Sequence, residues 1–177
     1  MNPLKILMIG PQGSGKSTQS KLLAESLKIP VISTGEIFRK LSKERVGFGQ
    51  IIRTILEEGR LVDDQTTYTI VEDRLNQSDC RKGFVVDGYP RNIEQLRLFD
   101  PHFDRVIYLD VPEQELIRRL MERGRSDDTD ESVKRRLELY YQQTQPLLEY
   151  YKKQRILIEI SGMGDIQTIQ DEIKKRI

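Results

Sequence analysis

The stretch that decides the fold is GPQGSGKST, residues 10–18. It follows an almost unbroken apolar run, residues 4–9, which is typical of a strand buried on both faces of a parallel sheet. Leucines then recur at helical spacing in residues 22–27, so the glycines lie at a turn from a strand into a helix. In the pattern G-x-x-x-x-G-K-[ST], backbone N–H groups and a helix N-terminus surround phosphate oxygens. The stretch therefore predicts a phosphate-binding loop.

Two side chains of this loop and one later carboxylate have separate expected roles. The Lys16 ammonium would bridge the outer phosphates, and the Ser17 hydroxyl would bind Mg²⁺. Asp87 ends a later apolar strand, and a carboxylate at such a strand end commonly holds Mg²⁺ directly or through water. The alternative for Asp87 is a turn or N-cap aspartate. We expect a site for a nucleoside polyphosphate, with Mg²⁺ as cofactor at Ser17 and Asp87.

The composition limits the class of protein and its partners. The chain has 177 residues, which suits one domain, and its 29 basic and 28 acidic side chains leave a net charge of +1. This balance requires neither nucleic acid nor an anionic membrane as a partner. Cys80 is the only cysteine, which excludes an intrachain disulfide and a structural zinc site built from several thiolates. With no leader pattern and no apolar run of membrane-spanning length, we expect a cytoplasmic protein.

Apolar runs alternate with helix-period segments, which indicates βαβ units around a parallel sheet. The five expected strands are residues 4–9, 29–33, 83–87, 105–111 and 155–160. Pro30 has no N–H to donate to a neighbouring strand, so we expect the second strand at an edge of the sheet. In open parallel sheets ligands collect beyond the carboxyl ends of the strands, where this chain places residues 10, 34–35, 87–91 and 110.

The connections between these strands predict helices. The expected helices are residues 37–43, 50–58 and 64–76, one opened by Arg91, one from Pro112 that ends at Gly124, one from 130 to 152 with a kink at Pro146, and 166–177. Ser33 and Glu36 resemble a capping box in front of the first of them. The first two helices would form a small hairpin raised off the sheet, with the flanking glycines either as hinges or as ordinary caps.

Arg91 and Gln95 lie one helical turn apart, so they can present a guanidinium and an amide to the same cleft. An amide both donates and accepts hydrogen bonds, and it therefore matches the N6 and N1 edge of adenine. A guanidinium at such a place favours phosphate. The pair predicts a second nucleotide site, distinct from the phosphate-binding loop.

Several arginines gather around the short turn 124–129. Arg119 and Arg123 lie four residues apart on one helix face, Arg125 follows at once, and the next helix brings Arg135 and Arg136 to the same region. A phosphoryl group in transit carries charge on its equatorial oxygens, and converging arginines stabilise that charge. The alternative is a solvated charged face with ion pairs such as that of Arg119 with Glu115.

With these residues in view, the chain resembles the adenylate kinase family of nucleoside monophosphate kinases over almost its full length. The motifs that carry the resemblance are the phosphate-binding loop with Thr18-Gln19, Ser33-Thr34-Gly35 with Arg39, Glu58-Gly59-Arg60-Leu61-Val62, Asp87-Gly88-Tyr89-Pro90-Arg91 with Gln95, and Arg119, Arg123, Arg125, Asp127-Asp128 and Arg136. The resemblance implies a P-loop three-layer α/β/α fold with a five-stranded parallel sheet in the order 2-3-1-4-5. It also implies a single domain over residues 1–177, with a mobile helical acceptor-binding insertion over 34–63 and a short lid over about 124–129.

The resemblance also implies the reaction ATP plus AMP giving two ADP, with Mg²⁺, no covalent intermediate and a monomeric enzyme. ATP would be held by Gln12, Gly13, Ser14, Gly15, Lys16, Ser17, Thr18, Arg119 and Arg123. AMP would be held by Thr34, Gly35, Arg39, Arg60, Val62, Gly88, Arg91, Gln95, Arg125 and Arg136. The catalytic residues would be Lys16, Arg91, Arg119, Arg123, Arg125 and Arg136.

Thr34 and Gln95 match the adenylate pattern, whereas pyrimidine nucleotide kinases generally have alanine and asparagine there. Ser17 stands where the family usually has glycine, which favours a direct Mg²⁺ contact, and Glu36 replaces the usual aspartate. Only Gly124 separates Arg123 from Arg125, which makes the lid short. The alternatives are a kinase for UMP, CMP or another small acceptor, and an ATP-binding module whose short lid permits weak hydrolysis.

Overall fold

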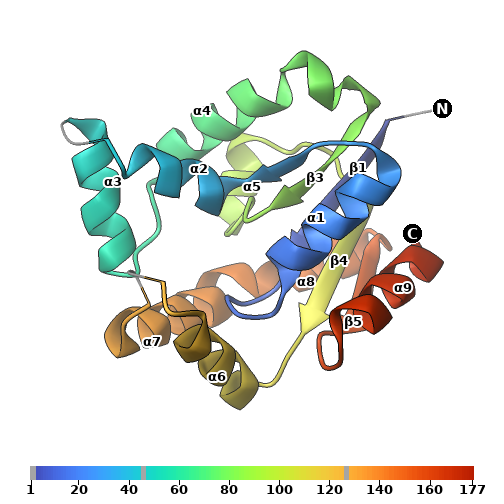
Figure 1. The fold of residues 1–177 in the computed structure, drawn as a ribbon. Coiled ribbons are helices and arrows are strands. Elements are labelled where there is room, and N and C mark those ends of the chain that lie inside the picture. The colour runs from blue at the N-terminus through green and yellow to red at the C-terminus, as the bar shows by residue number, and fades with distance from the viewer. Residues whose placement is uncertain (1–2, 45–46, 126–127) are drawn as a thin grey trace.

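The computed structural model describes residues 3–44, 47–125 and 128–177. One parallel sheet crosses the molecule in the order β2-β3-β1-β4-β5 (Figure 1). Its strands are β1 (Leu4–Ile9), β2 (Val31–Ser33), β3 (Gly83–Asp87), β4 (Arg105–Asp110) and β5 (Leu157–Ser161). The predicted fold class and strand order are confirmed, and β2 lies at the edge that Pro30 predicted. β2 and β5 each begin two residues later than expected.

Helices cover both faces of this sheet. They are α1 (Lys16–Leu27), α2 (Thr34–Leu41), α3 (Phe48–Glu57), α4 (Asp64–Leu75), α5 (Ile93–Leu98), α6 (Glu113–Arg123), α7 (Asp130–Leu139), α8 (Pro146–Lys153) and α9 (Ile166–Arg176). A 3₁₀ helix, η1 (Ser78–Lys82), and a π-helical turn, η2 (Tyr140–Thr144), complete the described elements. Within the described ranges, none of these helices combines the length and the apolar character needed to span a bilayer.

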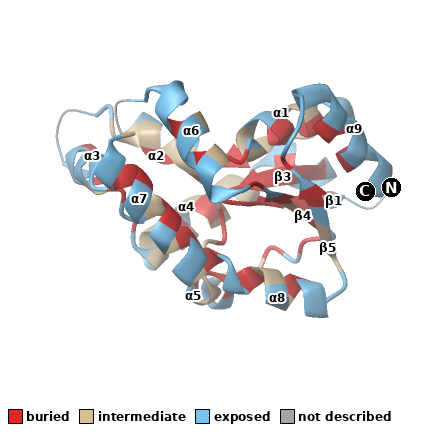
Figure 2. Cartoon of the chain, turned by 90° about the horizontal axis from the view of Figure 1, so that it is seen from below, coloured by how far each residue is buried: buried red, intermediate tan, exposed pale blue. Residues whose placement is uncertain are grey.

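The alternation along β1 explains the three layers. Leu7 and Ile9 join the core cluster beneath α4, α5 and α8, whereas Ile6 and Met8 join the cluster beneath α1 and α9. Successive side chains of a strand point to opposite faces, so an all-apolar strand needs a cover on each face. Figure 2 shows this arrangement, with α1 and α9 on one side of the buried strands and α5 and α8 on the other.

Two pairs of helices extend beyond the carboxyl ends of the strands. Helices α2 and α3 enclose a small core of their own around Phe38, Ile52 and Val62. Helices α6 and α7 enclose another, which includes Leu116 and Val133. Both pairs lie at the end of the molecule away from the two termini (Figure 1). The register pairs Asp87 of β3 with Met8 of β1 and with Ser33 of β2. These three strands therefore end at nearly the same place along the sheet, next to the two helix pairs.

Three helices begin at other residues than predicted, and of these α3 begins at Phe48 rather than at residue 50. Helix α5 begins at Ile93, after Arg91, because the extended residue Asn92 is the N-cap and its side chain accepts from the backbone N–H of Gln95 at 2.7 Å. Helix α2 begins directly after Ser33, which caps it by accepting from Glu36 N, while the Glu36 carboxylate pairs with Lys21 at 2.6 Å. The capping role of Ser33 is therefore confirmed, and the helix begins at Thr34, three residues earlier than predicted.

The predicted long helix of residues 130–152 is present, with helical backbone from α7 through the π turn η2 into α8. The irregularity lies just before Pro146, where Gln145 N donates to Tyr140 O at 2.9 Å, and Pro146 occupies the first position of α8. Proline lacks an N–H and fits the first turn of a helix, so the helix widens before Pro146 and continues from there as α8.

Candidate active site

The phosphate-binding loop connects β1 to α1 beside the half-buried positive charge of Lys16. Gly15 is the N-cap of α1, with φ of +91°, and Lys16 is the first residue of the helix. The Lys16 Nζ donates back to the carbonyl of Pro11 at 3.1 Å. Burial lowers the pKa of Lys16 to about 8, against the opposing charge of Asp87 and with the neighbouring arginines adding to the decrease. A phosphate placed here would add negative charge beside Lys16 and raise its pKa again.

A carboxylate and two hydroxyls meet at the ends of β2 and β3. Ser17 Oγ donates to Asp87 Oδ2 at 2.5 Å, and Ser33 Oγ lies 3.5 Å from the same oxygen. Asp87 is 4% exposed. The structure thus brings the two predicted metal residues into contact, as an oxygen-only group of the kind that Mg²⁺ prefers. Among the described residues, no group of three or more His, Cys, Asp or Glu side chains could hold a metal ion.

Two pockets lie side by side at this end of the sheet. The donor-side pocket is lined by the phosphate-binding loop, Ser17, Asp87 and Arg119. The acceptor-side pocket lies over Thr34, Val62 and Gln95 and reaches Arg136. The residues common to both linings are Gln12, Lys16, Gly35, Arg39, Arg91, Arg123 and Arg125. A lysine and four arginines therefore stand where the pockets meet, which suits a phosphoryl group that passes from one to the other.

The acceptor pocket is built tightly around Gly88. Its φ is +95°, and a Cβ added there would lie 2.5 Å from Thr34 Oγ1, so only glycine fits. The carbonyl of Gly88 accepts from Thr34 Oγ1 and from Arg91 Nε, each at 3.0 Å. Burial lowers the pKa of Arg91, with Asp87 opposing and Arg136 and Arg39 adding to the decrease. Because the charges of Arg136 and Arg39 both lower the pKa of Arg91, the three guanidiniums must lie close together.

Asp128 organises the arginines beside the lid. Its side chain is fully buried and accepts from Arg123 Nε and Nη2, at 2.8 and 2.7 Å, and from Arg136 Nη1 at 2.8 Å. The pKa of Asp128 is lowered: burial opposes the decrease, while hydrogen bonds and charge from Arg123 and Arg136 produce it. Arg136 Nη2 also donates to the carbonyl of Leu56 in α3 at 2.9 Å. A single guanidinium therefore connects α7 to the Asp128 carboxylate and to α3.

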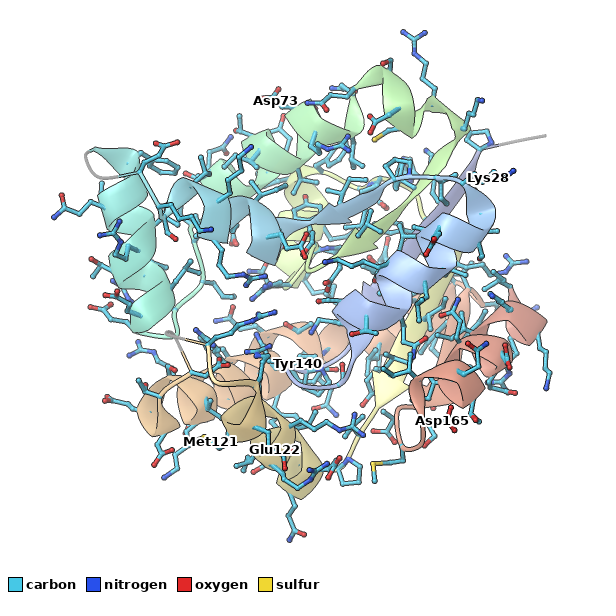
Figure 3. All side chains as sticks on the ribbon, in the orientation of Figure 1. Lys28, Asp73, Met121, Glu122, Tyr140 and Asp165 are labelled. Carbon is cyan, nitrogen blue, oxygen red and sulfur yellow. The ribbon has the colours of Figure 1, made fainter. Side chains whose placement is uncertain are left out.

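Arg119 lines the donor pocket and is held there by two hydrogen bonds. Its Nε donates to Glu115 Oε1 at 2.6 Å, and its Nη2 donates to the carbonyl of Gly162 at 3.1 Å. The ion pair that was the alternative explanation for Arg119 is thus present, and the same side chain also lines the donor pocket. Met121 and Glu122, on the same helix α6, are labelled in Figure 3.

Most of the predicted site residues line one pocket or both. Gly13, Gly15 and Thr18 line the donor side, and Arg60 lines the acceptor side while pairing with Glu58 at 2.5 Å. The side chain of Ser14 lines neither pocket: Ser14 is 1% exposed, and its Oγ lies 2.8 Å from where a Cβ on Gly10 would stand. Of the lid over about 124–129, Ser126 and Asp127 lie outside the described residues.

The structure adds site residues that the sequence did not indicate. Tyr140 and Thr144 line the acceptor pocket from η2 (Figure 3, where Tyr140 is labelled), and Thr144 Oγ1 donates to the carbonyl of Arg91 at 2.7 Å. Asp64 accepts from the side chain of Gln95 at 2.9 Å. Asp128 belongs to a motif already quoted from the sequence, whereas the π turn of Tyr140 and Thr144 and a contact across 31 residues leave no local pattern.

Comparison with known proteins agrees with this geometry. A family model described as adenylate kinase matches residues 8–156. The chain is 42% identical to a protein of Bifidobacterium longum named adenylate kinase, over 98% of this chain and 97% of that protein. It is 39% identical to a protein of the same name from Leptospira biflexa, over 98% of this chain and 99% of that protein. An adenylate kinase of Thermoanaerobacter sp. is 35% identical, over 98% of each chain.

Proposed function

The chain belongs to the adenylate kinase family of phosphotransferases, and we infer from this and from its site that it catalyses the reversible transfer of a phosphoryl group from ATP to AMP, giving two ADP. The observation that carries the inference is the boundary between the pockets, where Lys16 and four arginines line both sides. Such chemistry needs two bound nucleotides held in line and cations along the path of the phosphoryl group. The amide of Gln95 in the acceptor pocket supports adenine as the accepting base.

The side chains divide the work between positioning and charge. The phosphate-binding loop and Arg119 would hold the triphosphate of ATP, and Lys16 would lie against its outer phosphates. Arg39 and Arg91 would bind the phosphate of AMP, Thr34 and Gln95 its base. Arg123, Arg125 and Arg136 would face the charge that develops on the equatorial oxygens of the phosphoryl group. The AMP phosphate is itself the nucleophile, so the chain needs no covalent intermediate.

We propose residues 34–63 as an acceptor segment that closes over AMP, and about 124–129 as the lid over ATP. The bond from Arg136 to Leu56 O supports this, because it joins the acceptor segment to α7 directly after the lid. Gly59 supports it as well, since a Cβ added there would lie 2.8 Å from Ser132 O of α7. Closure of this kind excludes water from the transferring phosphoryl group. We also propose that the chain acts as a monomer, as its resemblance to the family implies.

The oxygens of Ser17 and Asp87 fit Mg²⁺, because Asp87 is a buried carboxylate that accepts hydrogen bonds from the hydroxyls of Ser17 and Ser33. A magnesium ion bound with ATP would neutralise charge on the outer phosphates. We propose that Ser17 Oγ binds it directly, turning away from Asp87 Oδ2, and that Asp87 binds it directly or through water.

Replacement of Ser17 by alanine tests this assignment. We expect the Mg²⁺ concentration for half-maximal ADP formation to rise roughly tenfold, with kcat at saturating Mg²⁺ within about threefold of wild type. The matched control is Ser26→Ala in the same helix, whose hydroxyl donates to Leu23 O at 2.8 Å, away from both pockets. A Ser17→Ala enzyme with the wild-type Mg²⁺ requirement would mean that Ser17 only holds Asp87.

The proposed reaction is tested by ADP formation from ATP, AMP and Mg²⁺. We expect ADP to appear only when AMP is present, with two ADP formed for each ATP consumed. A reaction without acceptor measures hydrolysis, and reactions with UMP or CMP measure the choice of acceptor. ATP consumption that is independent of AMP would favour the weakly hydrolysing module, and faster reaction with UMP or CMP would favour a pyrimidine nucleotide kinase.

A further inference from the structure

The Gln95 carboxamide is held at both of its polar atoms. Its Oε1 accepts from the backbone N–H of Arg91 at 2.7 Å, and its Nε2 donates to Asp64 Oδ1 at 2.9 Å. Its backbone is also tied down, because its N–H donates to Asn92 Oδ1 and its carbonyl accepts from the Tyr89 hydroxyl, each at 2.7 Å. Gln95 is 1% exposed. The position and the tilt of the amide are therefore determined by its neighbours.

These two contacts also determine which way round the amide points. If it turned by 180°, its NH₂ group would face the N–H of Arg91, and its oxygen would face the carboxylate of Asp64. Both contacts would then join groups of like polarity. An N–H can only donate and an ionised carboxylate can only accept, so neither partner can adapt. Asp64 is itself held in place, since the same Oδ1 accepts from Asn92 Nδ2 at 3.0 Å.

An amide fixed in this way still offers one N–H and one acceptor site to a ligand. Gln95 lines the acceptor pocket, where these two groups are available to a base. Adenine presents N6–H as donor beside N1 as acceptor, and it matches one orientation of an amide. Hypoxanthine, the base of IMP, presents O6 as acceptor beside N1–H as donor, and it matches the reverse orientation. A free amide would turn to suit either base, whereas a fixed one selects between them.

We propose that Asp64 is a positioning residue that sets base specificity, by holding the Gln95 carboxamide in the orientation that accepts adenine and rejects hypoxanthine. The proposal rests on the proposed function, because it requires the acceptor base to contact Gln95. The hydrogen bond from Gln95 to Asp64 is not part of the capping of α4. Asp64 is the first residue of α4, and the N-cap is Asp63, which accepts from Thr66 N at 2.9 Å.

The test compares AMP with IMP as acceptors, using the ratio of their kcat/KM values with ATP as donor. In Asp64→Ala we expect this ratio to fall at least about tenfold, through a higher KM for AMP and a gain in use of IMP, while the KM for ATP stays within about twofold. Asp64→Asn keeps an acceptor atom and loses the charge, so we expect an intermediate ratio.

Asp73→Ala is the matched control, since it removes an exposed carboxylate from the same helix α4, away from the residues that line the pockets. We expect it to leave the AMP to IMP ratio unchanged. In a Gln95→Ala background, Asp64→Ala should change the ratio less than about twofold, because Asp64 acts through Gln95.

Two different failures can be told apart. A wild-type protein that forms no ADP from ATP and AMP overturns the proposed function. An active wild type whose Asp64→Ala variant keeps the wild-type ratio overturns the role of Asp64 alone, and so does an equal effect of Asp64→Ala with and without Gln95.

Discussion

Replacement of Lys16 by methionine is expected to lower kcat for AMP-dependent ADP formation by about 10³-fold or more while the protein stays folded. Lys16 lines both pockets, and its ammonium donates to the backbone carbonyl of Pro11 at 3.1 Å. Methionine has nearly the same length without the charge. The matched control is Lys21→Met in the same helix, where an exposed side chain pairs with Glu36 and kcat should stay within about twofold of wild type.

The lowered pKa of Lys16 allows a second readout that does not depend on turnover. The pKa of Lys16 is about 8, so Lys16 is largely neutral at pH 9, and bound triphosphate should raise the pKa again. ATP binding at pH 9 should therefore take up close to one proton, measured by calorimetry in buffers of different ionisation enthalpy. Lys16→Met should lose that uptake. Equal proton uptake in both proteins, or a kcat near that of wild type, would remove Lys16 from the transfer site.

The same pKa also predicts how Lys16 affects stability. A lysine whose pKa falls on folding weakens the folded state while it is charged, and this cost is relieved as pH rises from about 8 toward the usual value of 10.5. At pH 7 the buried charge is a full cost. Lys16→Met should therefore keep or raise the midpoint of thermal unfolding at that pH. A large loss of activity without a loss of stability separates a catalytic role from a structural one.

The features that sequence alone predicted are those in which a local pattern has one structural solution. A glycine-rich turn between an all-apolar strand and a helix is such a pattern, and Pro30 at a sheet edge is another. Gly124 also ended its helix as expected, with φ of +62° at the C-cap. In each case a few neighbouring residues determine the backbone, so no information from distant parts of the chain is needed.

The features that escaped prediction depend on partners far away in sequence. The sequence predicts Asp64 only as the start of a helix, and the fold is what brings it into contact with Gln95. The sequence predicts Arg136 only as one of several arginines near the lid. The contact with Leu56, 80 residues earlier, comes from the fold. The start of α5 was misplaced because Pro90 and Arg91 precede an asparagine cap whose strength depends on its own contact with Asp64. Tertiary contacts decided these cases over local preference.

Replacement of Arg136 by alanine is expected to lower kcat by about 10² to 10³-fold and to raise the KM for AMP roughly tenfold. The first effect follows from losing a guanidinium that lines the acceptor pocket, and the second from losing the bond to Leu56 O that holds the acceptor segment. Asp128 would remain paired with Arg123 through two hydrogen bonds, so the buried carboxylate keeps a counter-charge and the fold should persist. Steady-state kinetics with AMP varied, together with thermal unfolding, measure these effects.

Arg135→Ala is the matched control, because Arg135 is the neighbouring arginine of α7 and is exposed. It removes the same charge from the same helix, so a loss shared by both variants would point to the general positive field rather than to contacts. Arg136→Lys sharpens the comparison further. A lysine keeps the charge, but its single ammonium cannot hold the planar arrangement that joins Asp128 to Leu56 O, so the KM for AMP should stay high while kcat recovers in part. A wild-type KM for AMP in Arg136→Lys would show that charge alone, and not the tether between α7 and α3, is what Arg136 contributes.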